Sequence, residues 1–99
     1  MFYAQIPNGW GVSPTSAQEA LKEARHATGM SAATLRREPH YVLEFPEGTE
    51  VTTNTVWGSW SSTRHPIAIA VAQNLSAAQL AYLTDMLVRA ALAAKEEAA

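Results

Sequence analysis

Residues 67–94 read IAIAVAQNLSAAQLAYLTDMLVRAALAA, and they contain a strand followed almost directly by a helix. In the first part, apolar residues alternate with alanine, which is the period of a strand: Ile67, Ile69 and Val71. Ser76 and Gln79 then form a capping box that starts the helix. The helix is predicted to turn one stripe inward: Leu80, Leu83, Leu87, Ala91 and Ala94. A strand with an apolar face, followed directly by an amphipathic helix that can pack on that face, predicts an α+β domain.

The N-terminal third also begins with a strand and continues with a helix. Residues 2–6 are predicted to form the strand, and the turn signal Pro7-Asn8-Gly9 ends it, with residues 10–12 as an optional returning arm. Two helix starts fit the residues that follow. Ser13 before Pro14 fits one cap, and Ser16 with Glu19 fits a capping box one turn later. Gly29 is expected to end this helix in the left-handed conformation.

The middle of the chain has strand character. A short second helix is predicted within residues 31–37, and residues 41–45 then alternate as a half-buried strand. Residues 50–62 are rich in Thr, Val and Trp, and we expect one strand there with a bulge at Gly58. The predicted fold is therefore α+β, with a small antiparallel sheet of three to four strands packed against two helices in the order β-α-(α)-β-β-β-α. The helices are expected on one face of the sheet, and residues 1–99 are expected to form a single domain.

The amino-acid composition excludes several classes of function. The 99 residues include no cysteine, which excludes disulfides, thiolate metal sites and cysteine nucleophiles. The net charge of −2 lacks the basic excess that drives binding to nucleic acid. No signal peptide and no apolar run long enough to span a bilayer is present in the sequence, so we predict a cytoplasmic protein without membrane contact.

Candidate catalytic residues are few. None of His26, His40 and His65 pairs with another histidine at helical spacing, so neither a metal nor a cofactor is predicted. Serines 59, 61 and 62 near His65 lack the strand-to-helix elbow of a serine nucleophile. We therefore predict that the protein is not an enzyme. A small enzyme with a His-based site is the lowest-ranked of three hypotheses for its function.

A second hypothesis comes from residues 24–37, ARHATGMSAATLRR. This stretch resembles the helix-turn-helix of bacterial transcription factors, whose second helix reads the major groove. The resemblance implies that DNA contacts would come from the second helix: Ser31, Thr34, Arg36 and Arg37. Arg25 departs from the motif, because the family has a small residue where the two helices cross.

The preferred hypothesis is a non-catalytic protein-binding module. Trp57 and Trp60 stand three apart on the predicted strand, so one of them is expected to face solvent, where tryptophan is enriched at protein–protein hot spots. The predicted surface consists of Trp57, Trp60, Thr53, Thr55 and Trp10. Small size, slight acidity and the scarcity of motifs are typical of small phage or mobile-element proteins that bind and inhibit host machinery, for example a defence system. A homodimer, joined through strands or through the last helix, is also predicted.

Overall fold

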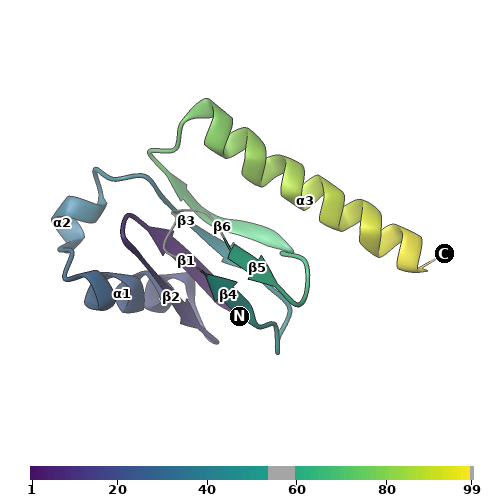
Figure 1. Ribbon diagram of the computed structural model, residues 1–99, viewed down its shortest axis with the longest axis horizontal. Coiled ribbons are helices and arrows are strands. Elements are labelled where there is room, and N and C mark those ends of the chain that lie inside the picture. Colours follow the sequence, from purple (N-terminus) through teal and green to yellow (C-terminus); the bar gives the residue numbers. More distant parts are fainter. Residues whose placement is uncertain (54–59, 99) are drawn as a thin grey trace.

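The computed structural model describes residues 1–53 and 60–98 (Figure 1). The described residues form six strands and three helices: β1 (Phe2–Ile6), β2 (Gly9–Ser13), α1 (Ala17–Thr28), α2 (Ala32–Leu35), β3 (His40–Glu44), β4 (Val51–Thr53), β5 (Trp60–Ser62), β6 (Ala68–Gln73) and α3 (Ala77–Ala98). The predicted α+β class with a small antiparallel sheet is confirmed. The order β-β-α-α-β-β-β-β-α contains two strands more than predicted.

Four strands form the main sheet in the spatial order β2-β1-β3-β6, and each neighbouring pair is antiparallel. β1 and β2 are joined by a two-residue turn, in which Pro7 precedes Asn8 and Asn8 takes a φ of 65°. Proline followed by a positive-φ residue is the pattern of a type II turn. The optional returning arm is therefore a full strand, and it forms one edge of the sheet.

The segment 50–62 is not one strand, as predicted, but the two arms of a separate hairpin. Val51 pairs with Ser62, and Thr53 pairs with Trp60. The sequences before and after Gly58 both favour strands. The two strands form backbone hydrogen bonds with each other instead of joining the main sheet. The expected bulge at Gly58 lies outside the described residues.

α1 covers one face of the main sheet, and its start and end follow local signals. Ser16 caps the helix by accepting a hydrogen bond from the Glu19 amide at 3.1 Å, which decides between the two predicted starts. Gly29 ends it with a φ of 75°, as predicted. Gly9 and Gly11 of β2 let the helix approach the strand closely. The core between them is small and aliphatic: Ala4, Ile6, Ala20, Ala24, Leu35 and Val42.

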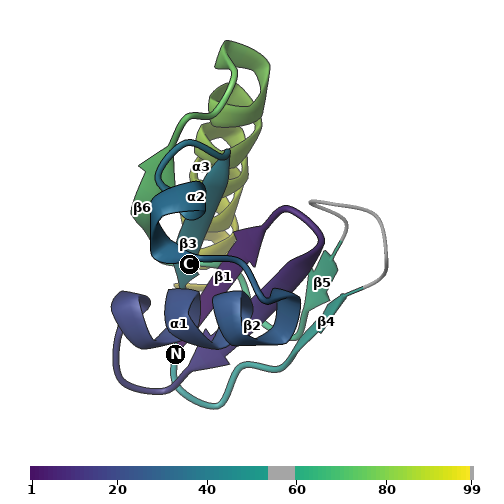
Figure 2. The same cartoon turned by 90° about the vertical axis from the view of Figure 1, so that its left-hand side faces the viewer.

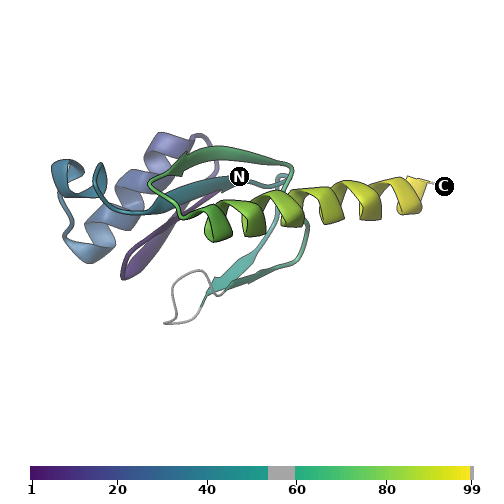
Figure 3. The same ribbon diagram turned by 90° about the horizontal axis from the view of Figure 1, so that it is seen from above.

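α3 and the β4–β5 hairpin cover the opposite face, as Figures 2 and 3 show. The expectation that both helices share one face is therefore wrong. This second core is mainly aromatic and leucine-rich: Tyr3, Tyr41, Leu43, Phe45 and Leu83. An irregularity in the β3–β6 register pairs Val42 with Val71 but Leu43 with Ile69, so the β6 strand carries one extra residue there. Because of this bulge, Val71 contacts the α1 core and Ile69 the aromatic core.

The capping box at the start of α3 is confirmed, and the predicted inward stripe is confirmed in part. The Ser76 amide donates to Gln79 Oε1 at 2.8 Å, and the Gln79 amide donates to Ser76 Oγ at 3.1 Å. Leu83 is buried and Leu87 half-buried, but Leu80 and Ala91 are exposed, and the side chain of Ala94 lies outside what the structure describes. Leu83 is 2 % exposed, whereas Leu80 is 45 % exposed. The residues that turn inward are Leu83, Met86 and Ala90. The helix contains apolar residues on most of its circumference, so only the position of the sheet decides which of them are buried.

Candidate protein-binding surface

A row of four aromatic rings crosses the sheet face that lies opposite α1. The Trp10 ring stacks near Tyr3, with centroids 6.4 Å apart, and Tyr3 lies 5.7 Å from Trp60. Trp60 meets Phe45 edge-on, again at 5.7 Å. Offset and edge-to-face pairs at these distances stabilise aromatic clusters. The row runs from the buried Phe45 to the exposed Trp10.

Trp60 anchors the hairpin to this row. Its indole Nε1 donates a hydrogen bond to the Tyr41 hydroxyl at 2.9 Å, and its side chain is half-buried. Burial raises the pKa of Tyr41 to about 12, although the hydrogen bond from Trp60 acts in the opposite direction. Burial likewise raises the pKa of Tyr3 well above its ordinary value. Both hydroxyls therefore stay protonated at neutral pH and act as hydrogen-bonding groups.

The exposed end of the row is the free edge strand β2. The Trp10 side chain is 42 % exposed and that of Val12 is 40 % exposed. A buried network fixes the hairpin that carries them. The Tyr3 hydroxyl donates to Gln5 Oε1 at 2.6 Å, and Gln5 Nε2 donates to the Gly9 carbonyl at 3.0 Å. An exposed indole is thus held on a rigid support.

The structure brings together part of the predicted surface. Trp10 and Trp60 belong to the same aromatic row, and half-buried Thr53 pairs with Trp60 in the hairpin. Trp57 and Thr55 lie outside the described residues. Val12 was not predicted, although the Gly-Trp-Gly-Val sequence contains the signal. Alternating glycines mark the face where a helix approaches, so Trp10 and Val12 must point to the other face.

A second apolar surface lies on the outer side of α3. Three large side chains there are about half exposed: Leu80, Val88 and Leu92. The C-terminal turns of this helix extend past the end of the sheet (Figure 1). Sequence reasoning assigned Leu80 to the core and did not single out the others.

The segment with the helix-turn-helix resemblance forms a different arrangement. α2 is a single turn of four residues, and its Leu35 is buried in the α1 core. Ser31 caps this turn by accepting from the Thr34 amide at 3.1 Å. Arg36 and Arg37 are exposed, and the Arg36 carbonyl accepts a hydrogen bond from Asn74. A recognition helix needs several residues along the groove, so this geometry lends no support to DNA reading, which stays a prediction.

His40 and His65 lie at opposite ends of the β3–β6 strand pair. His40, at the start of β3, is buried, and its Nδ1 lies 2.8 Å from the Glu38 carbonyl. His65 is exposed in the loop after β5, whereas residues near His40 pair with the far end of β6. In the part of the chain that the structure describes, no group of three or more His, Cys, Asp or Glu side chains could hold a metal ion.

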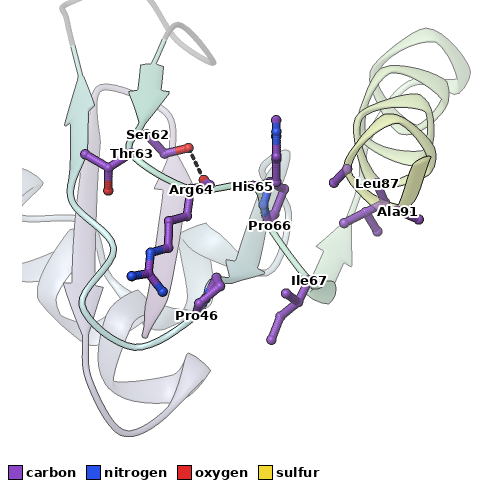
Figure 4. A pocket seen from close by; sticks show the side chains of 10 residues that line it. Pro46, Ser62, Thr63, Arg64, His65, Pro66, Ile67, Leu87 and Ala91 are labelled. Atoms are coloured by element: carbon purple, nitrogen blue, oxygen red, sulfur yellow. Dashed lines mark hydrogen bonds between the residues drawn. The ribbon is translucent and has the colours of Figure 1, made fainter. Parts of the chain in front are cut away.

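His65 also borders an open groove of about 760 Å³ between its loop and α3 (Figure 4). The groove is lined by the exposed Arg64 and His65 on one side and by Leu87 and Ala91 of α3 on the other. Its described lining contains no carboxylate that could pair with the imidazole. The hypothesis of a His-based enzyme stays a prediction.

Comparisons of the chain with protein-family models, with curated proteins and with solved structures find no match. Within the described residues, none of the helices has the length and apolarity that a membrane crossing requires.

Proposed function

We propose that this protein is a non-catalytic protein-binding module whose main contact surface is the β2 edge with Trp10 and Val12. The observation that carries the proposal is the exposure of the Trp10 indole at the end of the aromatic row. Tryptophan dominates binding energy at many protein interfaces, and a side chain on a rigid support loses little freedom on binding. Here the stacked Tyr3 ring and the Gln5 network supply that support.

The proposal extends to oligomeric state and biological role. The outer face of α3, with Leu80, Val88 and Leu92, would join two copies of the chain. The small, slightly acidic chain would act as a phage or mobile-element protein that blocks host machinery by occupying a partner's binding surface. Light scattering after size-exclusion chromatography tests the dimer, and a monomer mass at high protein concentration would remove that part of the proposal.

The binding proposal is tested by comparing two surface variants, Trp10→Ser and Ile67→Ser. Both remove an exposed apolar side chain, but only the first lies on the β2 edge, and Ile67 precedes the strand at the other edge. Tagged wild-type protein and both variants are used to capture partners from the cell of origin. We expect a protein whose recovery falls about tenfold with Trp10→Ser and remains with Ile67→Ser.

The captured protein is then purified with the wild-type chain, and hydrogen exchange of the complex is expected to show protection at β2. Equal capture by wild type and Trp10→Ser would contradict the proposed surface. Thermal unfolding of each variant confirms that the fold is retained.

A further inference from the structure

The two edges of the main sheet differ in how well they are protected against pairing with another strand. Exposed edges are usually protected by bulges, charged side chains or proline. β6 carries the bulge between its pairs with Val42 and Leu43. β2 pairs with β1 in continuous register over all five residues, and its sequence GWGVS contains no charged residue and no proline. The β2 edge is therefore open to an additional strand.

The hairpin geometry defines which backbone groups face outward. In a two-residue hairpin, Ile6 and Gly9 next to the turn form a hydrogen-bonded pair, and such pairs alternate along the ladder. Gly9, Gly11 and Ser13 therefore direct their N–H and C=O groups toward β1. Trp10 and Val12 direct theirs away from the sheet, and within the described residues no hydrogen bond to these groups is present. These are also the two residues with exposed apolar side chains.

The helix flank above the β2 edge carries two carboxylates. Glu19 and Glu23 are exposed and stand one turn apart on α1, with the exposed Lys22 between them in the sequence and the helix's basic end after them. A Cβ built on Gly11 would lie 2.9 Å from the Glu23 Cβ, so this flank of α1 overhangs β2. A strand added to β2 would present alternate side chains to the Trp10 face and to the carboxylates.

We propose that β2 binds an extended segment of a partner protein in which apolar residues alternate with Lys or Arg. The inference rests on the proposed protein-binding function and identifies the partner's chemistry. Main-chain hydrogen bonds to Trp10 and Val12 supply affinity. Apolar side chains pack beside the indole, and basic side chains reach Glu19 and Glu23. Strand addition of this kind selects partners by the alternation of apolar and basic residues and not by one individual residue.

A second copy of this chain does not fit the edge in an antiparallel pairing. α1 lies directly across β2, since a Cβ built on Gly11 would meet the backbone of Ala20 and Ala24 (Figure 2). Paired strands are about 5 Å apart, so two β2 strands would bring two α1 helices to a similar spacing. Packed helices need about 8–10 Å between their axes. A single extended segment carries no helix and avoids this clash.

The test uses a blocked heptapeptide in which lysine and valine alternate, Ac-KVKVKVK-NH2, and the matched peptide with glutamate in place of lysine. Titrations are followed by the amide resonances of ¹⁵N-labelled full-length protein. We expect the lysine peptide to shift and protect the Trp10 and Val12 amides and to bind about tenfold tighter than the glutamate peptide at low salt. The double substitution Glu19→Gln with Glu23→Gln should remove this preference.

Two further changes test the main-chain contacts. Val12→Pro removes the outward N–H and should bind about tenfold more weakly than Val12→Thr, which also changes the side chain but keeps that group. If Val12→Pro unfolds, the lysine peptide with N-methylated valines makes the same test on the ligand side. Unchanged binding in these tests, or no binding of the lysine peptide, would overturn strand addition. Capture that depends on Trp10 would still stand in that case, so the two proposals can fail separately.

Discussion

On the α1 face of the sheet, helix and strands meet through glycine and alanine, whereas the opposite face is filled by aromatic rings and leucine. Small residues let α1 lie close to β2 and leave little apolar surface uncovered along the contact. On the other face, bulky side chains raise α3 and the hairpin above the sheet, and large apolar groups remain at the margins: Trp10, Val12, Leu80, Val88 and Leu92.

This difference separates a structural face from the proposed interaction face. A contact made of small residues depends on backbone proximity and tolerates almost no added volume. A contact made of large residues depends on individual side chains. Replacing the exposed residues next to such a contact lowers the stability of the fold only slightly. The residues best suited to bind a partner are thus found where the core is aromatic.

The largest effect is expected for Leu83→Ala, which tests the aromatic side of the comparison. Leu83 is 2 % exposed, so the change should lower the free energy of unfolding by about 3 kcal/mol. At protein concentrations too low for the proposed dimer, Leu92→Ala on the outer side of α3 should change it by less than about 0.5 kcal/mol. Urea unfolding at such concentrations measures both. Similar losses for the two variants there would contradict the contrast between a packed inner side and an unpacked outer side of α3 in the monomer.

Gly11→Ala tests the α1 side. The added methyl group would lie 2.4 Å from the Ala24 amide nitrogen and 2.5 Å from the Ala20 carbonyl oxygen, and the backbone must move to admit it. We expect a loss of roughly 2–3 kcal/mol in urea unfolding.

The control for this prediction is Gly48→Ala. Gly48 has a φ of 82° and no atom near its built Cβ, so only backbone strain of about 1 kcal/mol is expected. A Gly11→Ala variant as stable as Gly48→Ala would show that α1 can shift freely on β2.

Alkaline pH probes the centre of the aromatic row. The pKa of Tyr41 is about 12 in the folded protein and about 10 in an unfolded chain. Between these values the unfolded chain has released a proton that the folded chain still holds. Tyr41 should therefore lower the free energy of unfolding by on the order of 2 kcal/mol between pH 10 and pH 12, and Tyr3, whose pKa is also raised by burial, adds a fall of its own over the same range. Tyr41→Phe should remove the share of Tyr41 and leave that of Tyr3, and an unchanged profile in that variant would exclude Tyr41 as a contributor.

The smallest effect is expected for Asp85→Asn. Asp85 and Arg89 form an exposed ion pair at 2.9 Å, one turn apart on α3, as their spacing predicts. Water screens such pairs, so the loss should be at most about 0.5 kcal/mol by urea unfolding. A loss well above 1 kcal/mol would indicate that this part of α3 is covered by another molecule.

Local signals were predictable from the sequence where one turn of chain contains all the partners. The caps at Ser16 and Ser76, the glycine end of α1 and the turn at Asn8 belong to this class. The candidate surface was predictable only in part. Trp10 and Trp60 were named, but their connection through Tyr3 depends on strands that lie side by side only in the fold.

The amino-acid sequence by itself determined the α+β class, the end of α1, the start of α3 and the strand propensity of the middle segment, because these depend on neighbours within a few residues, but it left two possible starts for α1. Tertiary structure alone decided which face each helix covers, the bulge that sends Ile69 and Val71 to opposite cores, and the choice of Leu83 over Leu80 as the buried residue of α3. An apolar side chain can pack against any apolar surface that reaches it, and only the folded sheet determines which surface that is.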